Sequence, residues 1–333
     1  MTSLLEAYEE ADSHFDAIPV IDLEHATSPD FEKRRAIADA IRDACLRVGF
    51  FYIKNHGIDE SLISTCIDSS KQFFDLPLPT KEAMDIRKSP NYKGYTGLLT
   101  ENTDPEHGAG DMHEAFEWGY EDIDRQSDDV VREDGAMKGA NVWPSEQDVP
   151  GFRLSLLNYY HAAVQLGLSL FPLLALALNQ PEDFFADKTL HPAAIMRVLH
   201  YPPQTGEMDD RVIGIGAHTD YECFTILWQD NVGGLQVLNG EGKWIQAPPI
   251  PGTFVVNLGD QLARWTNDVF KSTRHRAINR SGVRRYSIPL FYGTDYNVLL
   301  EPIPSCVSKE HPPKYEVVKA GDYVKSRLAA TYH

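Results

Sequence analysis

The feature that most restricts the fold of this chain is a series of short apolar segments that begins after residue 193. The segments are separated from one another by Gly, Pro, Asn and Asp. This spacing is typical of an antiparallel β-sandwich or barrel. The predicted strands cover residues 195–201, 211–217, 223–229, 234–238, 243–246, 253–258, 273–278 and 284–292.

The first half of the chain has a different pattern. Apolar residues at helical spacing predict helices over residues 31–47 and 60–75, and a longer helix over 151–179 that Pro172 should kink or break. A final helix is expected over 314–330. The remaining predicted elements are short strands over 17–23, 50–53, 92–95 and 115–118 and long loops within 86–150. The pattern therefore predicts an α+β fold with a mainly β core, in which residues 1–150 and 151–333 fold as one cooperative unit.

Charge and cysteine content limit the classes of partner. The net charge is -18, which argues against binding to nucleic acid or to an anionic membrane surface. The N-terminus is acidic and lacks the pattern of a signal peptide, and no uninterrupted apolar run approaches the roughly 20 residues that span a bilayer. The four cysteines are far apart and form no CxxC pair, which favours reduced thiols and a cytoplasmic location. The oligomeric state is not evident from the sequence.

A potential metal site is formed by His218 and Asp220, with His275 as a third candidate ligand. Two histidines and one carboxylate are the ligand set of the facial triad that holds non-haem Fe(II) and leaves coordination positions open. On a strand, His218 and Asp220 would share one face, because side chains alternate with period two. The His-x-Asp triplet alone is a weak signal, since such pairs arise often by chance.

The predicted strand 284–292 carries polar residues on one of its faces. Arg285 and Ser287 share that face with Pro289 and Phe291. If it points inward, the Arg and Ser could hold a carboxylate, because a buried guanidinium requires an anion. If it points outward, Tyr286, Ile288 and Leu290 fill the core instead. The period alone leaves both registers open.

The predicted strand 195–201 presents the same ambiguity. Arg197, Leu199 and Tyr201 lie on one face, with His200 on the other. Arg197 is expected either to point inward, as a second anion-binding or hydrogen-bonding group, or to form a structural ion pair. Other histidines are weaker candidates for metal ligands and are expected to be structural or solvated: His56, His113, His161, His191 and His311.

Motifs throughout the chain resemble one known family. They are Ile18-Pro19-Val20-Ile21-Asp22-Leu23, Gly49-Phe50-Phe51-Tyr52-Ile53-Lys54-Asn55-His56-Gly57, Gly216-Ala217-His218-Thr219-Asp220-Tyr221, Asn257-Leu258-Gly259-Asp260, Lys271-Ser272-Thr273-Arg274-His275-Arg276 and Arg285-Tyr286-Ser287. In this order they resemble the isopenicillin-N-synthase-like branch of the Fe(II)/2-oxoglutarate-dependent dioxygenases.

The resemblance implies a double-stranded β-helix (jelly-roll) barrel, flanked by N-terminal helices and a long central helix. It implies that His218, Asp220 and His275 bind Fe(II) and that Arg285 and Ser287 bind the distal carboxylate of 2-oxoglutarate, which favours the inward register of Arg285. We also assign Tyr201 to the cosubstrate site. The residues expected to line the substrate pocket are Arg197, Tyr221, Phe291 and Trp228.

The activity implied is oxidation of a small organic molecule by O2, with decarboxylation of 2-oxoglutarate to succinate and with ascorbate as a candidate reductant. Hydroxylation is the expected outcome, and desaturation and ring closure are variants. Two alternatives remain open: an Fe(II) oxidase of the same family that does not use 2-oxoglutarate, and a catalytically silent binding protein. The substrate could be a pyrimidine, a polyketide, a terpenoid or a phenolic compound.

Overall fold

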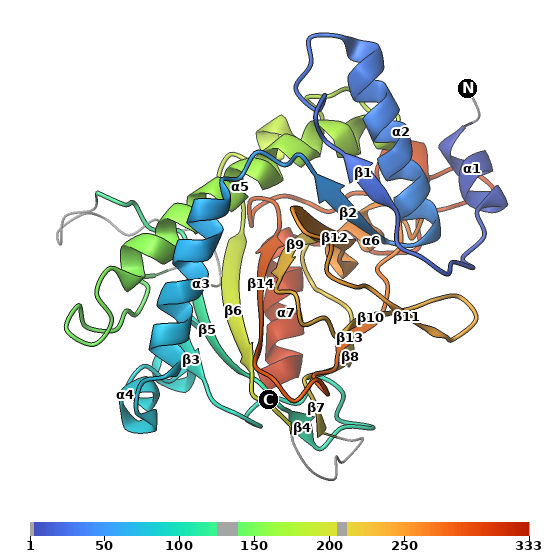
Figure 1. Ribbon diagram of the computed structural model, residues 1–333. Helices are drawn as coiled ribbons and strands as arrows, with labels where there is room; N and C mark the ends of the chain where they lie inside the picture. Colours follow the sequence, from blue (N-terminus) through green and yellow to red (C-terminus); the bar gives the residue numbers. More distant parts are fainter. Residues whose placement is uncertain (1–2, 125–138, 205–211, 333) are drawn as a thin grey trace.

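Two β-sheets form the centre of the protein in the computed structural model, which describes residues 3–124, 139–204 and 212–332 (Figure 1). Residues 125–138, within the predicted loop region 86–150, and residue 211, the first of a predicted strand, lie outside the described residues. The larger sheet has eight strands in the order β1 (Val20–Asp22), β2 (Phe50–Lys54), β12 (Thr253–Leu258), β9 (Phe224–Gln229), β14 (Arg285–Tyr292), β6 (Ala194–Tyr201), β5 (Glu114–Gly119) and β3 (Gly94–Thr96).

The smaller sheet has four antiparallel strands, in the order β11 (Trp244–Gln246), β10 (Leu235–Leu238), β13 (His275–Ala277) and β8 (Ile215–His218). A separate parallel pair joins β4 (Gly110–Asp111) to β7 (Val212–Ile213). The predicted antiparallel core is therefore present as two sheets, and residues from both line one cavity.

One predicted strand is divided in two. Residues 211–217 were expected to be continuous, but β7 ends at Ile213 and β8 begins at Ile215. Gly214 lies between them, where a Cβ atom would be 2.8 Å from the Ala277 carbonyl oxygen and 2.9 Å from the Tyr201 ring. The absence of a side chain lets the backbone pass close to both neighbours while β7 and β8 pair with different strands.

The helices are α1 (Leu4–Glu10), α2 (Phe31–Arg47), α3 (Glu60–Phe74), α4 (Leu78–Glu82), α5 (Phe152–Ala177), α6 (Asp260–Trp265) and α7 (Ala320–Tyr332). Helices α2 and α3 have the predicted extents to within one residue and begin at side-chain caps, Asp30 and Asp59. Both pack against α5. Helix α7 begins later than the predicted residue 314, because Lys314 and Tyr315 instead bond to Asp268.

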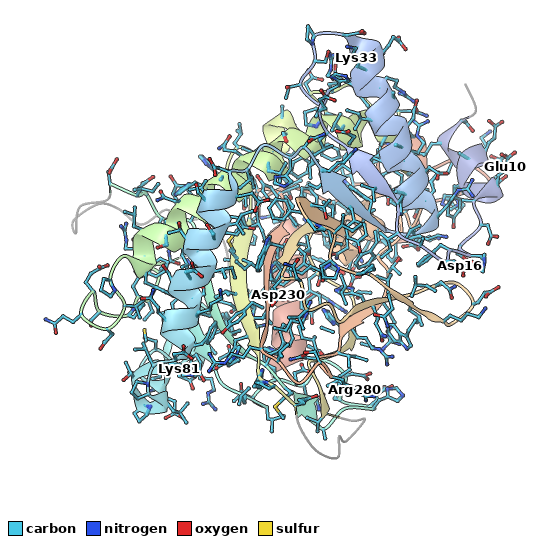
Figure 2. All side chains as sticks on the ribbon, in the orientation of Figure 1. Glu10, Asp16, Lys33, Lys81, Asp230 and Arg280 are labelled. Atoms are coloured by element: carbon cyan, nitrogen blue, oxygen red, sulfur yellow. The ribbon has the colours of Figure 1, made fainter. Side chains whose placement is uncertain are left out.

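Helix α5 covers the outer face of the larger sheet. Tyr160 donates a hydrogen bond to the Ala194 carbonyl, and Tyr292 donates one to the Val164 carbonyl. The helix continues through Pro172, so the alternative of a break there is wrong. Burial on both sides of Pro172 outweighs the roughly 3 kcal/mol cost of an internal proline. Side chains fill the space between the helices and the sheet (Figure 2).

Among the described residues, α5 is the one helix whose length and apolar composition, taken alone, would allow it to cross a membrane. Most of its apolar segment is buried inside the protein, as in the core helix of a globular domain. The main core contains residues from both predicted regions of the chain, from Leu4 to Ala320. The division at residue 150 stays a prediction.

The alternation of side chains on β14 separates the core from the cavity. Tyr286, Ile288, Leu290 and Tyr292 belong to the core that α5 covers, and the intervening residues Arg285, Ser287, Pro289 and Phe291 line the cavity. Strand β6 is divided in the same way, with Arg197, Leu199 and Tyr201 on the cavity side. The two registers that the sequence left open are thereby resolved in favour of inward arginines.

The close approach of α5 to β14 gives a stability prediction. A Cβ atom on Gly167 would lie 2.2 Å from the ring of Tyr292. Gly167→Ala should therefore destabilise the protein by about 1–3 kcal/mol through overpacking, although Gly→Ala normally stabilises a helix. The midpoint of urea unfolding at constant slope measures the effect. Ser169→Ala in the same helix is the control and should change stability little; a stabilised Gly167→Ala would contradict the packing.

Candidate active site

Three potential metal ligands converge at one end of the smaller sheet. His218 is the last residue of β8, His275 is its cross-strand partner on β13, and Asp220 lies two residues beyond β8. The Nε2 atoms of both histidines are 3.6 Å from Oδ1 of Asp220. The three ligand atoms lie within 4.8 Å of one another. Strand pairing therefore assembles the triad, although Asp220 itself is not in a strand.

The backbone orients both imidazoles. Nδ1 of His218 lies 2.8 Å from the Gly216 carbonyl oxygen, and Nδ1 of His275 lies 3.1 Å from that of Thr273. A carbonyl oxygen only accepts, so each Nδ1 carries the proton and leaves Nε2 available to bind a metal. Burial, together with the neighbouring His218, lowers the pKa of His275 to about 4. His275 is therefore neutral at physiological pH, as a ligand must be.

Asp220 is held by two donors that the sequence analysis did not identify. Its Oδ2 accepts hydrogen bonds from Oγ1 of Thr225 and, at 2.6 Å, from Nδ2 of Asn257. This leaves Oδ1 to face the two histidines. Burial raises the pKa of Asp220, but the adjacent imidazoles and these hydrogen bonds outweigh burial and hold the pKa below its usual range. The sequence signal for Asn257 was a polar residue inside the apolar strand 253–258.

The donor set fits Fe(II). Two imidazole nitrogens and one carboxylate oxygen approach from one side, which is the arrangement of the facial triad. The outer contacts of each ligand are also present, with Gly216 and Thr273 behind the histidines and Asn257 behind the carboxylate.

The second part of the site surrounds Arg285, which is 1% exposed. Its Nε and Nη1 have no hydrogen-bond partner among the described residues, and Nη2 is 3.5 Å from Oε1 of Gln229. The guanidinium lies 4.5 Å from the centre of the Tyr201 ring, and the Tyr201 hydroxyl is 3.2 Å from that of Ser287. A buried cation with unpartnered N–H groups is costly. The group thus fits the distal carboxylate of 2-oxoglutarate.

Three of the four predicted pocket residues line this cavity: Arg197, Tyr221 and Phe291. The structure does not bring Trp228 to it. On β9, Thr225 and Leu227 face the cavity, so alternation directs Trp228 to the opposite face. There Trp228 lines a separate depression beside α3. The prediction for Trp228 is corrected accordingly.

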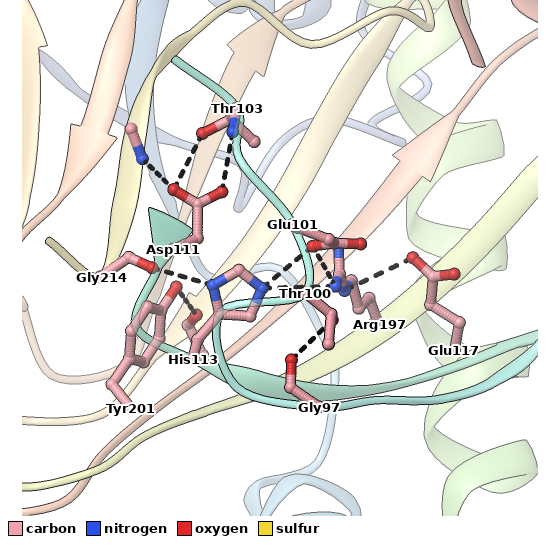
Figure 3. Close-up of polar contacts among 12 residues, drawn as sticks. Gly97, Thr100, Glu101, Thr103, Asp111, His113, Glu117, Arg197, Tyr201 and Gly214 are labelled. Carbon is pink, nitrogen blue, oxygen red and sulfur yellow. Dashed lines mark hydrogen bonds and ion pairs between the residues drawn. The ribbon is translucent and has the colours of Figure 1, made fainter. Parts of the chain in front are cut away.

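Several polar residues of the cavity wall were not predicted as site residues. Among them, Glu101, His113 and Glu117 surround Arg197 (Figure 3). His113 was expected to be structural or solvated; it is 2% exposed, and its Nδ1 lies 2.8 Å from the Gly214 carbonyl oxygen. Arg197 both faces the cavity and forms an ion pair, with Nη2 2.6 Å from Oε2 of Glu101. Arg197 therefore points inward and also forms the structural ion pair, while its role toward a substrate stays a prediction.

Comparisons with known proteins identify the family. Residues 192–294 match the 2OG-Fe(II) oxygenase superfamily, and residues 18–146 match the N-terminal model described as non-haem dioxygenase in morphine synthesis. A 2-oxoglutarate-Fe(II) type oxidoreductase of Metarhizium majus is 37% identical over 324 residues, which cover 93% of this chain and 86% of that protein. The chain belongs to the 2-oxoglutarate/Fe(II) oxygenase family.

Solved structures agree with this assignment. The full-length thymine 7-hydroxylase of Neurospora crassa in complex with α-ketoglutarate matches with a TM-score of 0.82 and 32% identity, over 94% of this chain and 96% of that one. The same enzyme in complex with α-ketoglutarate and thymine matches with a TM-score of 0.81 and 31% identity over the same fractions. These matches confirm the resemblance of the sequence motifs to the dioxygenase family. The oxygenase is thus an oxidoreductase that uses iron and 2-oxoglutarate.

The contact between Asn257 and Asp220 gives a prediction about metal affinity. Asn257→Ala removes a donor that fixes the carboxylate of the oxygenase, so Fe(II) affinity should fall by about 10- to 100-fold. Anaerobic calorimetric titration with Fe(II) measures it. Asn239→Ala is the matched control, because Asn239 is also buried but bonds to the Phe15 carbonyl oxygen. Equal iron affinity in the two variants would contradict the role of Asn257.

Proposed function

We propose that this oxygenase hydroxylates an unactivated C–H bond of a small organic molecule bound in the cavity between the two sheets. In this proposal His218, Asp220 and His275 hold Fe(II). Arg285, Ser287 and Tyr201 hold the distal carboxylate of 2-oxoglutarate. The observation that carries the proposal is the buried Arg285, whose unpartnered nitrogens face the same cavity as the three ligands. The site thus offers two anchors suited to the two ends of a keto diacid.

When bound, Fe(II) and 2-oxoglutarate supply the oxidising chemistry with O2, and succinate and CO2 are formed. The protein supplies position and shielding from water. The apolar part of the wall consists of Ile195, Leu199, Ile215, Leu227, Leu235, Ala277, Pro289, Phe291 and Val324. Such a wall favours an apolar reacting carbon and limits the access of solvent to the reaction.

The size of the cavity supports a small ligand. Its volume is about 190 Å³, below the range typical of sites for drug-sized molecules. We further propose that the two sheets close around this cavity as a double-stranded β-helix barrel. Strand β14 of the larger sheet and strand β13 of the smaller sheet both contribute residues to the cavity wall, which supports the proposal.

We also propose a cytoplasmic location for the protein. The four cysteines are unpaired and buried, which supports it.

Relatives act on different molecules. They include homoarginine-6-hydroxylase of Glycine max, 35% identical over 87% of this chain, and azadirone synthase of Melia azedarach, 31% identical over 91%. Identity at this level therefore does not select a substrate for this chain, and the polar residues of the cavity are a more direct guide.

Arg285 provides a direct test of the cosubstrate site. Arg285→Ala should weaken 2-oxoglutarate binding by about 10- to 100-fold, the effect of losing a charge-assisted hydrogen bond. The measurement is the 2-oxoglutarate concentration that gives half-maximal succinate release with Fe(II) and ascorbate. Arg284→Ala is the matched control, because Arg284 is exposed and pairs with Asp75. An unchanged 2-oxoglutarate requirement in Arg285→Ala would exclude this residue as the anchor.

The dependence of O2 consumption on 2-oxoglutarate tests the activity itself. The proposal requires that the wild-type protein consume O2 only when 2-oxoglutarate is present and that His218→Ala be inactive, because the metal loses a ligand. Full consumption without 2-oxoglutarate would favour an Fe(II) oxidase instead.

A further inference from the structure

Strand β5 carries two glutamates with contrasting surroundings. Glu114 lies on the outer face and accepts hydrogen bonds from Nζ of Lys81 at 2.6 Å and from the Tyr95 hydroxyl at 2.7 Å. It also lies 2.8 Å from Nδ1 of His200. These contacts hold the pKa of Glu114 below its usual value, although burial opposes them. Glu114 is a buried carboxylate whose partners belong to the protein.

Glu117 lies on the opposite face of β5 and lines the cavity. It is 6% exposed. Its carboxylate forms an ion pair with Nε of Arg197, its cross-strand neighbour, at 3.4 Å. This contact is not a hydrogen bond, because Nε of Arg197 has no hydrogen-bond partner among the described residues. Burial of a carboxylate with so weak a partner is unfavourable.

The nearby positive charges are directed to another acceptor. Nη2 of Arg197 and Nε2 of His113 both approach Oε2 of Glu101, at 2.6 and 3.1 Å (Figure 3). Glu101 therefore takes most of the compensation that Arg197 offers. Consistent with this, burial raises the pKa of Glu117 to about 7. The charge of Arg197 opposes this rise, and the charge of Glu101 adds to it.

The other cations of the cavity are also engaged. Arg276 stacks on the Trp244 ring at 4.0 Å and donates to Oε1 of Gln236 at 2.7 Å. Arg285 is assigned to the cosubstrate. The cavity consequently offers Glu117 as a carboxyl group in need of a donor, while its guanidinium groups are already engaged or assigned. Glu222 also lines the cavity, and its Oε2, which lies against Gly293, has no hydrogen-bond partner among the described residues.

We propose that Glu117 determines substrate specificity by binding a basic nitrogen group of the substrate, such as an amine, amidine or guanidine. This inference rests on the proposed oxygenase function and adds a substrate class to it. A protonated nitrogen group would supply the hydrogen bonds that Glu117 lacks, and its charge would balance a carboxylate that shares Arg197 with Glu101. An anionic substrate would meet an acidic surface on which the described guanidinium groups are engaged or assigned to the cosubstrate.

The test uses four probes with matched alkyl chains: n-butylguanidine, n-butylamine, butan-1-ol and pentanoate. Their dissociation constants are measured anaerobically with the protein loaded with Fe(II) and 2-oxoglutarate. Wild-type protein should bind the two cations at least about tenfold more tightly than the alcohol or the carboxylate, as expected for one charge-assisted hydrogen bond.

Three variants distinguish a binding role from a structural one. Glu117→Gln should reduce the preference for cations by about 10- to 100-fold, and Glu117→Asp, which keeps the charge, should retain most of it. Glu114→Gln is the matched control: it removes a buried carboxylate from the other face of β5 and should lower stability without changing the preference.

The proposal is overturned if wild-type protein does not prefer the cations, or if Glu117→Gln retains their preference. The oxygenase function is read separately, from the visible charge-transfer absorption of the Fe(II)–2-oxoglutarate complex and from succinate release by wild-type protein. If those signals are absent, the proposed function fails; if they are present without a cation preference, only the role of Glu117 fails.

Discussion

The alternation of side chains across the larger sheet is the constraint on which the rest of the structure depends. On β14, Tyr286 and Tyr292 belong to the core that α5 covers, which turns Arg285 and Ser287 into the cavity. A shift by one residue would place the guanidinium in the apolar core and the aromatic rings in the cavity. Packing under α5 therefore fixes the chemistry on the other side of the sheet.

Buried charge connects the parts of the site. Asp220 has two donors behind it and two imidazoles in front, so its ionised form is stabilised by the protein. Both Arg285 and Glu117 are buried on the cavity wall. Two nitrogens of Arg285 have no partner among the described residues, and Glu117 has a 3.4 Å ion pair with Arg197. Because isolated buried charges are unfavourable, we interpret these two groups as binding sites for molecules that enter the cavity, one anionic and one basic. Glu114, by contrast, is fully bonded within the protein and has a structural role.

Much of the fold and the ligand set could be predicted because the signals are local. Helices α2 and α3 and most strands follow from periodicity, and the triad follows from residue type and family resemblance. Periodicity could not choose the register of β14, since that choice depends on packing against α5, a distant segment. The orientation of Trp228 was wrong for the same reason, because nothing in its strand marks which face meets the cavity. Glu101 and His113 come from an irregular region without periodicity, and the bond from Asn257 to Asp220 joins residues that are far apart in the sequence.

The central claim is that the triad and Arg285 together bind Fe(II) and 2-oxoglutarate side by side. Anaerobic titration of Fe(II) into the metal-free protein, followed by visible absorption with and without 2-oxoglutarate, tests it most directly. The account predicts a charge-transfer band that saturates at one Fe(II) per chain, requires 2-oxoglutarate and is lost in Asp220→Ala. Iron binding with no such band at saturating 2-oxoglutarate, or a full band in Asp220→Ala, would contradict it.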